Sequence, residues 1–137
     1  MSWADSLIKL STYEVEILQK RLAEIAERKA DAEMRLLMLH AEGEAEAQRA
    51  REDAQAGWYQ IGFMEGLRLR KAAVQAKIDE IALEEQGCRD VLSQAFEAQK
   101  KYEQVAENGR LLARKEVARR ETAAMDELGL RRAVGGR

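Results

Sequence analysis

The chain has 137 residues and a net charge of −2; 35% of its residues are charged, 5% are aromatic and none is proline. This composition excludes an ordinary globular domain with a thick core, and the absence of an apolar run of about 18 residues excludes a transmembrane helix. What remains is a long all-α assembly whose apolar residues form narrow stripes.

The first such stripe runs from the N-terminus to about residue 40. Large apolar residues recur there at alternating steps of three and four, which is the heptad pattern of a coiled-coil seam. Its members are Ile8, Val15, Leu18, Leu22, Ile25, Leu36 and Leu39, with Ala4 and Ala32 in register. The pattern predicts a helix over residues 3–55.

The stretch GWYQIGFMEG, residues 57–66, follows a solvated segment and gathers three glycines and three aromatic residues. A second stripe begins directly after it. Its members are Leu67, Val74, Ile78, Ile81, Cys88, Leu92, Ala95, Tyr102 and Ala106. Two comparable stripes on either side of a glycine cluster predict an antiparallel αα-hairpin that turns at about residues 56–58.

The second helix is predicted over residues 59–128, so it is longer than the first and its C-terminal part must overhang. Gly129, Gly135 and Gly136 predict a flexible tail over 129–137. The whole chain, residues 1–137, is expected to be one coiled-coil domain.

In an antiparallel pair, the residue numbers that face each other add to a constant. Pairing Ile25 with Leu92 and Leu36 with Ile81 gives 117, whereas a slip of one heptad gives 110. We prefer 117 and expect Lys29 and Glu85, the one charged residue in the middle of each stripe, to reach toward each other and fix the register. The alternative is that both side chains bend out to solvent.

No residue pattern predicts catalysis, a cofactor or a metal. His40 has no partners at metal-ligand spacing, Cys88 occupies a seam position and has no nearby base, and the glycine cluster lacks the lysine of a phosphate-binding loop. We therefore expect that the chain is not an enzyme. The lone cysteine and the absence of a secretory signal favour a cytoplasmic protein.

Two surfaces are candidates for binding a partner. The first is the aromatic group Trp58, Tyr59 and Phe63 near the turn, which either anchors an interface or packs the turn closed. The second is the basic run Arg110, Arg114, Lys115, Arg119 and Arg120 on the overhanging helix. It is a solvated face, or it binds an acidic protein cavity or, less favoured because no aromatic residues interleave, nucleic acid.

The stretches LIKL near the start, WYQIGFMEGL after the turn and AAMDELGLRR near the end resemble the flagellar export protein family FliJ. The resemblance spans nearly the whole chain. It implies a component of a type III export apparatus, shaped like the central stalk of rotary ATP synthases. Sequence reasoning does not separate flagellar export from virulence-type secretion.

The resemblance also implies partners. They are the hexameric export ATPase, the cytoplasmic domain of the export gate and export chaperones, so that the chain would be peripheral to the inner membrane through its partners only. Phe63 and Leu67 match the family's gate-binding surface, to which Trp58 and Tyr59 are added here. The segment from Leu112 to Leu128 matches the part that enters the ATPase ring, with Arg110, Leu112, Arg114, Arg119, Arg120, Met125 and Leu128 as expected contacts.

The function expected from the resemblance is coupling of the ATPase to the gate. Two alternatives stay open: a passive coiled-coil scaffold or chaperone, and a nucleic-acid-binding coiled coil, although no nucleic acid is expected as a partner.

Overall fold

The computed structural model describes residues 2–53, 55 and 57–135 of the chain. It contains two α-helices, α1 (Trp3–Glu52) and α2 (Gly57–Gly135), and no strand among the described residues. The predicted all-α helical hairpin is confirmed.

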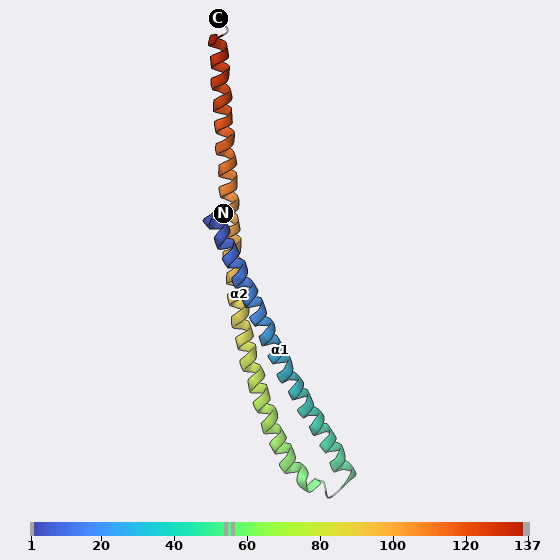
Figure 1. The fold of residues 1–137 in the computed structure, drawn as a ribbon. Helices are drawn as coiled ribbons and strands as arrows, with labels where there is room; N and C mark the ends of the chain where they lie inside the picture. The colour runs from blue at the N-terminus through green and yellow to red at the C-terminus, as the bar shows by residue number, and fades with distance from the viewer. Residues whose placement is uncertain (1, 54, 56, 136–137) are drawn as a thin grey trace. The chain divides into compact units, whose positions relative to one another are not determined.

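The chain divides into two compact units. One unit combines α1 up to Glu14 with α2 from Ala95 onward, and the other is the continuous stretch from Val15 to Gln94. Within each unit a segment of α1 packs against an antiparallel segment of α2 (Figure 1). The expectation of one coiled-coil domain stays a prediction.

Helix α1 begins with a capping box. The Ser2 hydroxyl accepts a hydrogen bond from the Asp5 backbone N–H at 3.2 Å, and the Asp5 carboxylate accepts one from the Ser2 backbone N–H at 3.4 Å. Two backbone donors at the helix start are thereby satisfied. Arg49 and Arg51 in the last turn of α1 complement its dipole.

The turn comes earlier than predicted. Helix α1 ends at Glu52 rather than at residue 55, and the Asp53 carboxylate accepts a hydrogen bond from the Gln55 backbone N–H at 3.0 Å. This Asx-type turn redirects the chain, so that α2 begins at Gly57 rather than at residue 59. Residue 54, from the predicted first helix, and residue 56, from the predicted turn, lie outside the described residues.

The predicted seam is confirmed. Every seam residue that the two stripes predicted is buried or half-buried. Ile25, Ile81 and Cys88 form a buried cluster with Leu22 and Ala32 packed against it. Burial of one such aliphatic side chain stabilises the hairpin by about 1.5–3 kcal/mol. The seam also contains Ser11, which is buried and which the apolar pattern missed.

The preferred register was wrong. Gly43 lies against Leu67, and these two residue numbers add to 110. The Gln99 amide donates a hydrogen bond to the Thr12 hydroxyl at 3.0 Å, and the numbers of this pair add to 111. Ile25 lies against Ile81 and Cys88, on either side of position 85. The chain therefore uses the register of 110, one heptad away from 117.

The predicted flexible tail over 129–137 was also wrong for its described part. Helix α2 continues through Gly129 to Gly135, and residues 136–137 lie outside the described residues. A helical glycine costs about 1 kcal/mol relative to alanine, which weakens a helix without ending it. Without proline or a residue of positive φ, nothing in this stretch forces α2 to stop.

Candidate protein-binding surfaces

The first turns of α2 carry an exposed apolar surface, which we call the tip surface and define as Trp58, Tyr59, Ile61 and Phe63. Trp58 is 89% exposed and Tyr59 is 78% exposed. Side chains so open to water do not pack the turn closed, so the interface interpretation of these two residues is the one the geometry favours. Phe63 is half-buried, and the Arg70 guanidinium lies over its ring at 5.9 Å from the centroid.

Leu67 differs from the other residues that were assigned to the gate surface. It is 1% exposed and is the largest fully buried side chain of the described chain. Its Cδ2 atom lies only 2.7 Å from the position that a Cβ on Gly43 would occupy. Leu67 thus joins α2 to α1 beneath the tip surface and does not present its side chain to a partner.

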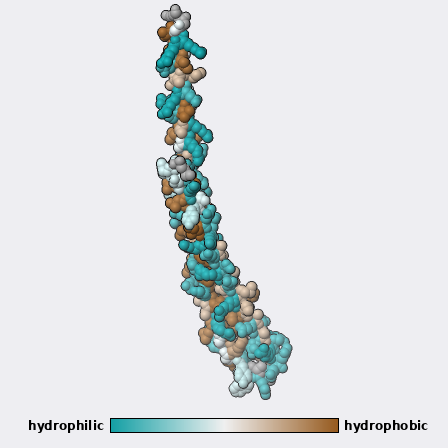
Figure 2. All heavy atoms as spheres, in the orientation of Figure 1, coloured by the Kyte–Doolittle hydropathy of each residue, from teal (hydrophilic) through white to brown (hydrophobic). Residues whose placement is uncertain are grey.

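The last part of α2, from residue 111 to Gly135, is exposed along its length apart from the half-buried Glu116. We call it the overhang segment. Figure 2 shows brown hydrophobic and teal hydrophilic side chains interspersed along it. Its exposed apolar residues include Leu112, Met125 and Leu128, of which Met125 is 69% exposed. A helix of this kind has no packing of its own in the described structure.

Much of the basic run is neutralised by neighbours on the same helix. Arg119 and Arg120 both contact Glu116, at 2.8 and 3.3 Å. The hydrogen bond from Arg119 lowers the pKa of the Glu116 carboxyl below its ordinary value. Arg110 contacts Glu107 at 3.0 Å and Asp5 of α1 at 3.7 Å. A run of compensated charges is a weaker attractor for nucleic acid than its count of arginines suggests.

The two charged seam residues lie close together. Lys29 Nζ is 3.4 Å from Glu85 Oε1, and the two side chains are 30% and 14% exposed. Arg89 NH2 also approaches Glu85, at 3.8 Å. Beside this pair, Arg28 donates to Glu84 at 2.6 Å, and that hydrogen bond lowers the pKa of the Glu84 carboxyl. The structure therefore places the pair where it bridges the helices instead of bending out to solvent.

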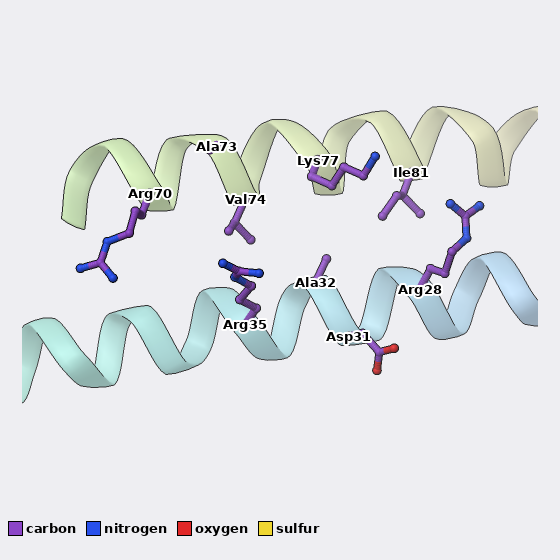
Figure 3. A pocket seen from close by; sticks show the side chains of 9 residues that line it. All are labelled: Arg28, Asp31, Ala32, Arg35, Arg70, Ala73, Val74, Lys77 and Ile81. Carbon is purple, nitrogen blue, oxygen red and sulfur yellow. The ribbon is translucent and has the colours of Figure 1, made fainter. Parts of the chain in front are cut away.

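A groove of about 550 Å³ lies between α1 and α2 within the unit from Val15 to Gln94 (Figure 3). Four basic residues and one acidic residue line it, together with a floor of small and aliphatic side chains. The lining residues are Arg28, Asp31, Ala32, Arg35, Arg70, Ala73, Val74, Lys77 and Ile81. Sequence reasoning missed this groove, although Ala32 in the seam, between two flanking arginines, is the signal that could have indicated it.

No group of three or more His, Cys, Asp and Glu residues in the described ranges is placed to hold a metal ion. No described helix has the length and apolar character needed to cross a membrane. The expectation that the chain is not an enzyme stays a prediction.

Two curated proteins resemble this chain along almost its full length. Both are named "Flagellar FliJ protein", and they come from Caulobacter vibrioides strains NA1000 / CB15N and ATCC 19089 / CIP 103742 / CB 15. Each is 56% identical to the chain over 136 residues, which is 98% of this chain and 98% of the relative. The chain belongs to the flagellar FliJ family. No family model matches the chain, and no solved structure matches it.

Membership of the FliJ family confirms the resemblance drawn from the short stretches of sequence. It places this chain among flagellar proteins, which favours the flagellar system over the virulence-type systems that the sequence alone left open. The partners that the FliJ resemblance implied, and the contact residues assigned to them, remain predictions.

Proposed function

We propose that this FliJ-family chain is a stalk-like component of the flagellar type III export apparatus, coupling the hexameric export ATPase to the cytoplasmic domain of the export gate. In this role it also assists the export of flagellar substrates or their chaperones. It lies in the cytoplasm at the flagellar base and reaches the inner membrane only through its partners.

The observation that carries the proposal is the overhang segment. This helical segment, residues 111–135, has almost no side chain packed against another element, although most helical stability in proteins comes from such packing. Exposed apolar residues such as Leu112 and Met125 gain stability if a partner covers them. A ring that surrounds a single helix covers all of its faces at once.

The tip surface supplies the second contact of the proposal. Trp58 and Tyr59 lie in the unit from Val15 to Gln94, whereas the overhang segment lies in the other unit. Exposed aromatic side chains are typical anchors of protein interfaces. Two separate surfaces on one chain allow two partners to be held at the same time, which coupling requires.

The ATPase contact is tested by the hydrolysis rate of the purified export ATPase with added chain. We expect wild-type chain to raise the rate, and the triple variant Leu112→Ala, Met125→Ala, Leu128→Ala to raise it far less. Leu83→Ala, at an exposed leucine of the other unit, is the matched control and should act as wild type. If wild-type chain leaves the rate unchanged, the passive scaffold or chaperone becomes the better description.

The gate contact is tested by calorimetric titration of the gate's cytoplasmic domain with the full chain. Because truncation of an aromatic anchor costs about 2 kcal/mol or more, the variant Trp58→Ala, Tyr59→Ala should bind at least about tenfold more weakly. Tyr13→Ala removes an exposed aromatic side chain elsewhere and should not change the affinity. Equal losses in both variants would contradict the assignment of the tip surface.

A further inference from the structure

We propose that the groove between α1 and α2 binds an acidic amphipathic helical segment of a partner protein, which packs as a third helix against the hairpin. This proposal does not rest on coupling between the ATPase and the gate. It assigns a third binding surface, distinct from the tip surface and the overhang segment.

The charges that line the groove set the chemistry of its occupant. Four of the lining residues are basic: Arg28, Arg35, Arg70 and Lys77. The one acidic lining residue is Asp31, and its side chain points away from the space between the helices in Figure 3. Anionic side chains therefore meet an excess of positive charge on both sides of the groove. An acidic partner is the complementary one.

Several of these cations are available to a partner. In the described part of the chain no carboxylate lies within salt-bridge distance of Arg35, and Arg70 is 3.9 Å from its nearest one, Glu42. Lys77 contacts Glu80 at 3.5 Å on the same helix, through an exposed pair that contributes little energy. Only Arg28 is held tightly, at 2.6 Å from Glu84. A partner carboxylate can thus bind without breaking a strong ion pair.

The floor of the groove favours a helix with one apolar face. Ala32, Val74 and Ile81 lie between the basic side chains, and the small alanine leaves room that a longer residue would fill. From Arg70 to Ile81 the α2 side of the groove extends for about 17 Å at 1.5 Å per residue. That length matches about three turns of helix, with apolar residues spaced at three and four along the face that enters the groove.

Two other occupants fit less well. Nucleic acid would place polar phosphate and sugar groups against the aliphatic floor, which offers them no hydrogen-bond partner. No aromatic side chain lines the groove to stack on a base. The overhang segment of a second copy, residues 111–135, carries six basic residues against four acidic ones, so its net charge does not complement the groove. An acidic helix satisfies both the charges and the floor.

The test uses the full chain and a fluorescein-labelled peptide of 15 residues, with leucines at helical spacing and glutamates on both flanks. Binding is followed by fluorescence anisotropy at low salt. The peptide should bind the wild-type chain, and the same peptide with glutamine in place of glutamate should bind at least about tenfold more weakly. The affinity of the acidic peptide should also fall as sodium chloride is added.

Variants of the chain locate the binding. Arg35→Glu with Lys77→Glu should weaken binding of the acidic peptide at least about tenfold, whereas Lys100→Glu with Lys101→Glu, which changes the net charge equally, should not. Ala73→Phe fills the groove without changing its charge and should also abolish binding. Circular dichroism of each variant, with an unchanged helical signal, shows that the hairpin is retained.

Four results would overturn the proposal, and the first three concern the peptides and the groove variants. They are equal binding of the acidic and the glutamine peptides, equal loss in the groove variant and its charge-matched control, and tighter binding of a DNA duplex that is lost in the same groove variants. Self-association of the chain that disappears with Arg35→Glu and Lys77→Glu would assign the groove to a second copy, and would overturn it as well.

Discussion

The ion pair between Lys29 and Glu85 is expected to cost the hairpin stability without selecting its register, because the two residue numbers add to 114 and the pair lies within about one helical turn of direct opposition in both the register of 110 and that of 117. Lys29→Leu and Glu85→Leu each remove one charge from the seam, and the double variant makes the seam apolar at both positions. A heptad slip from 110 to 117 leaves apolar residues opposite apolar residues and keeps the pair within about one helical turn, so the variants measure what the pair does to stability and whether it has any part in the register.

The expected magnitude follows from the geometry. Two charges 3.4 Å apart attract by about 5 kcal/mol at an effective dielectric constant of 20. Removal of Lys29 and Glu85 from water offsets most of this attraction, and a coupling of about 1 kcal/mol is left. Lys29→Leu should be the milder single change, because Arg89 still approaches Glu85 at 3.8 Å. The double variant should be more stable than wild type by about 1–3 kcal/mol.

The assay has two parts. Urea unfolding of the wild type, both single variants and the double variant gives the coupling energy from a double-mutant cycle. Spin labels at positions 33 and 76, in a Cys88→Ala background, report the register, since a heptad slip moves one helix past the other by about 10 Å. The double variant should keep the single distance of the wild type, because the pair does not distinguish the two registers. A coupling below about 0.3 kcal/mol, or a second distance in the double variant, would refute the reasoning.

Two further predictions concern local features. Gly87→Ala should stabilise the chain by about 1 kcal/mol, because nothing lies within 4 Å of the added Cβ, whereas Gly43→Ala should give no gain because its Cβ meets the buried Leu67 at 2.7 Å. Equal thermal shifts in the two variants would contradict this. Hydrogen bonds from Ser2 are the largest cause that lowers the pKa of Asp5, so the contribution of this cap is present above about pH 3.8 and is lost as the pH falls through the lowered value. Ser2→Ala should raise the Asp5 titration midpoint measured by NMR, and an unmoved midpoint would show that the cap is not its cause.

The sequence was sufficient to predict the hairpin because the seam is a repeated signal. Each aliphatic residue of the stripes adds to the same pattern, and a single exception such as Ser11 does not erase it. The helix ends were harder to predict, since they depend on single side chains. The first helix ends just before Asp53, whose carboxylate accepts one hydrogen bond from the Gln55 backbone N–H, and no periodic pattern records that bond.

The register could not be decided from the apolar pattern, because a shift of seven residues leaves that pattern unchanged. Gly43 was assigned to the solvated stretch before the turn, yet it is buried against Leu67. In the register of 110, Gly43, the smallest residue of α1, faces the large side chain of Leu67. Ala4 and Ala106 are both buried, and their residue numbers add to the same constant. Pairing by size therefore carries information that pairing by hydrophobicity lacks.

The candidate sites show a related limit, which Leu67 illustrates. Phe63 and Leu67 are one helical turn apart and share a face of α2, and the family resemblance assigned both of them to the gate surface. Leu67 lies in the seam and is buried against Gly43. Phe63 lies at the edge of the seam, and the Arg70 guanidinium lies over its ring. A change at Leu67 should then weaken gate binding only by destabilising the unit, whereas Trp58 and Tyr59 should act by contact. A residue that matches a binding surface in sequence is thus a contact only if the register leaves it exposed.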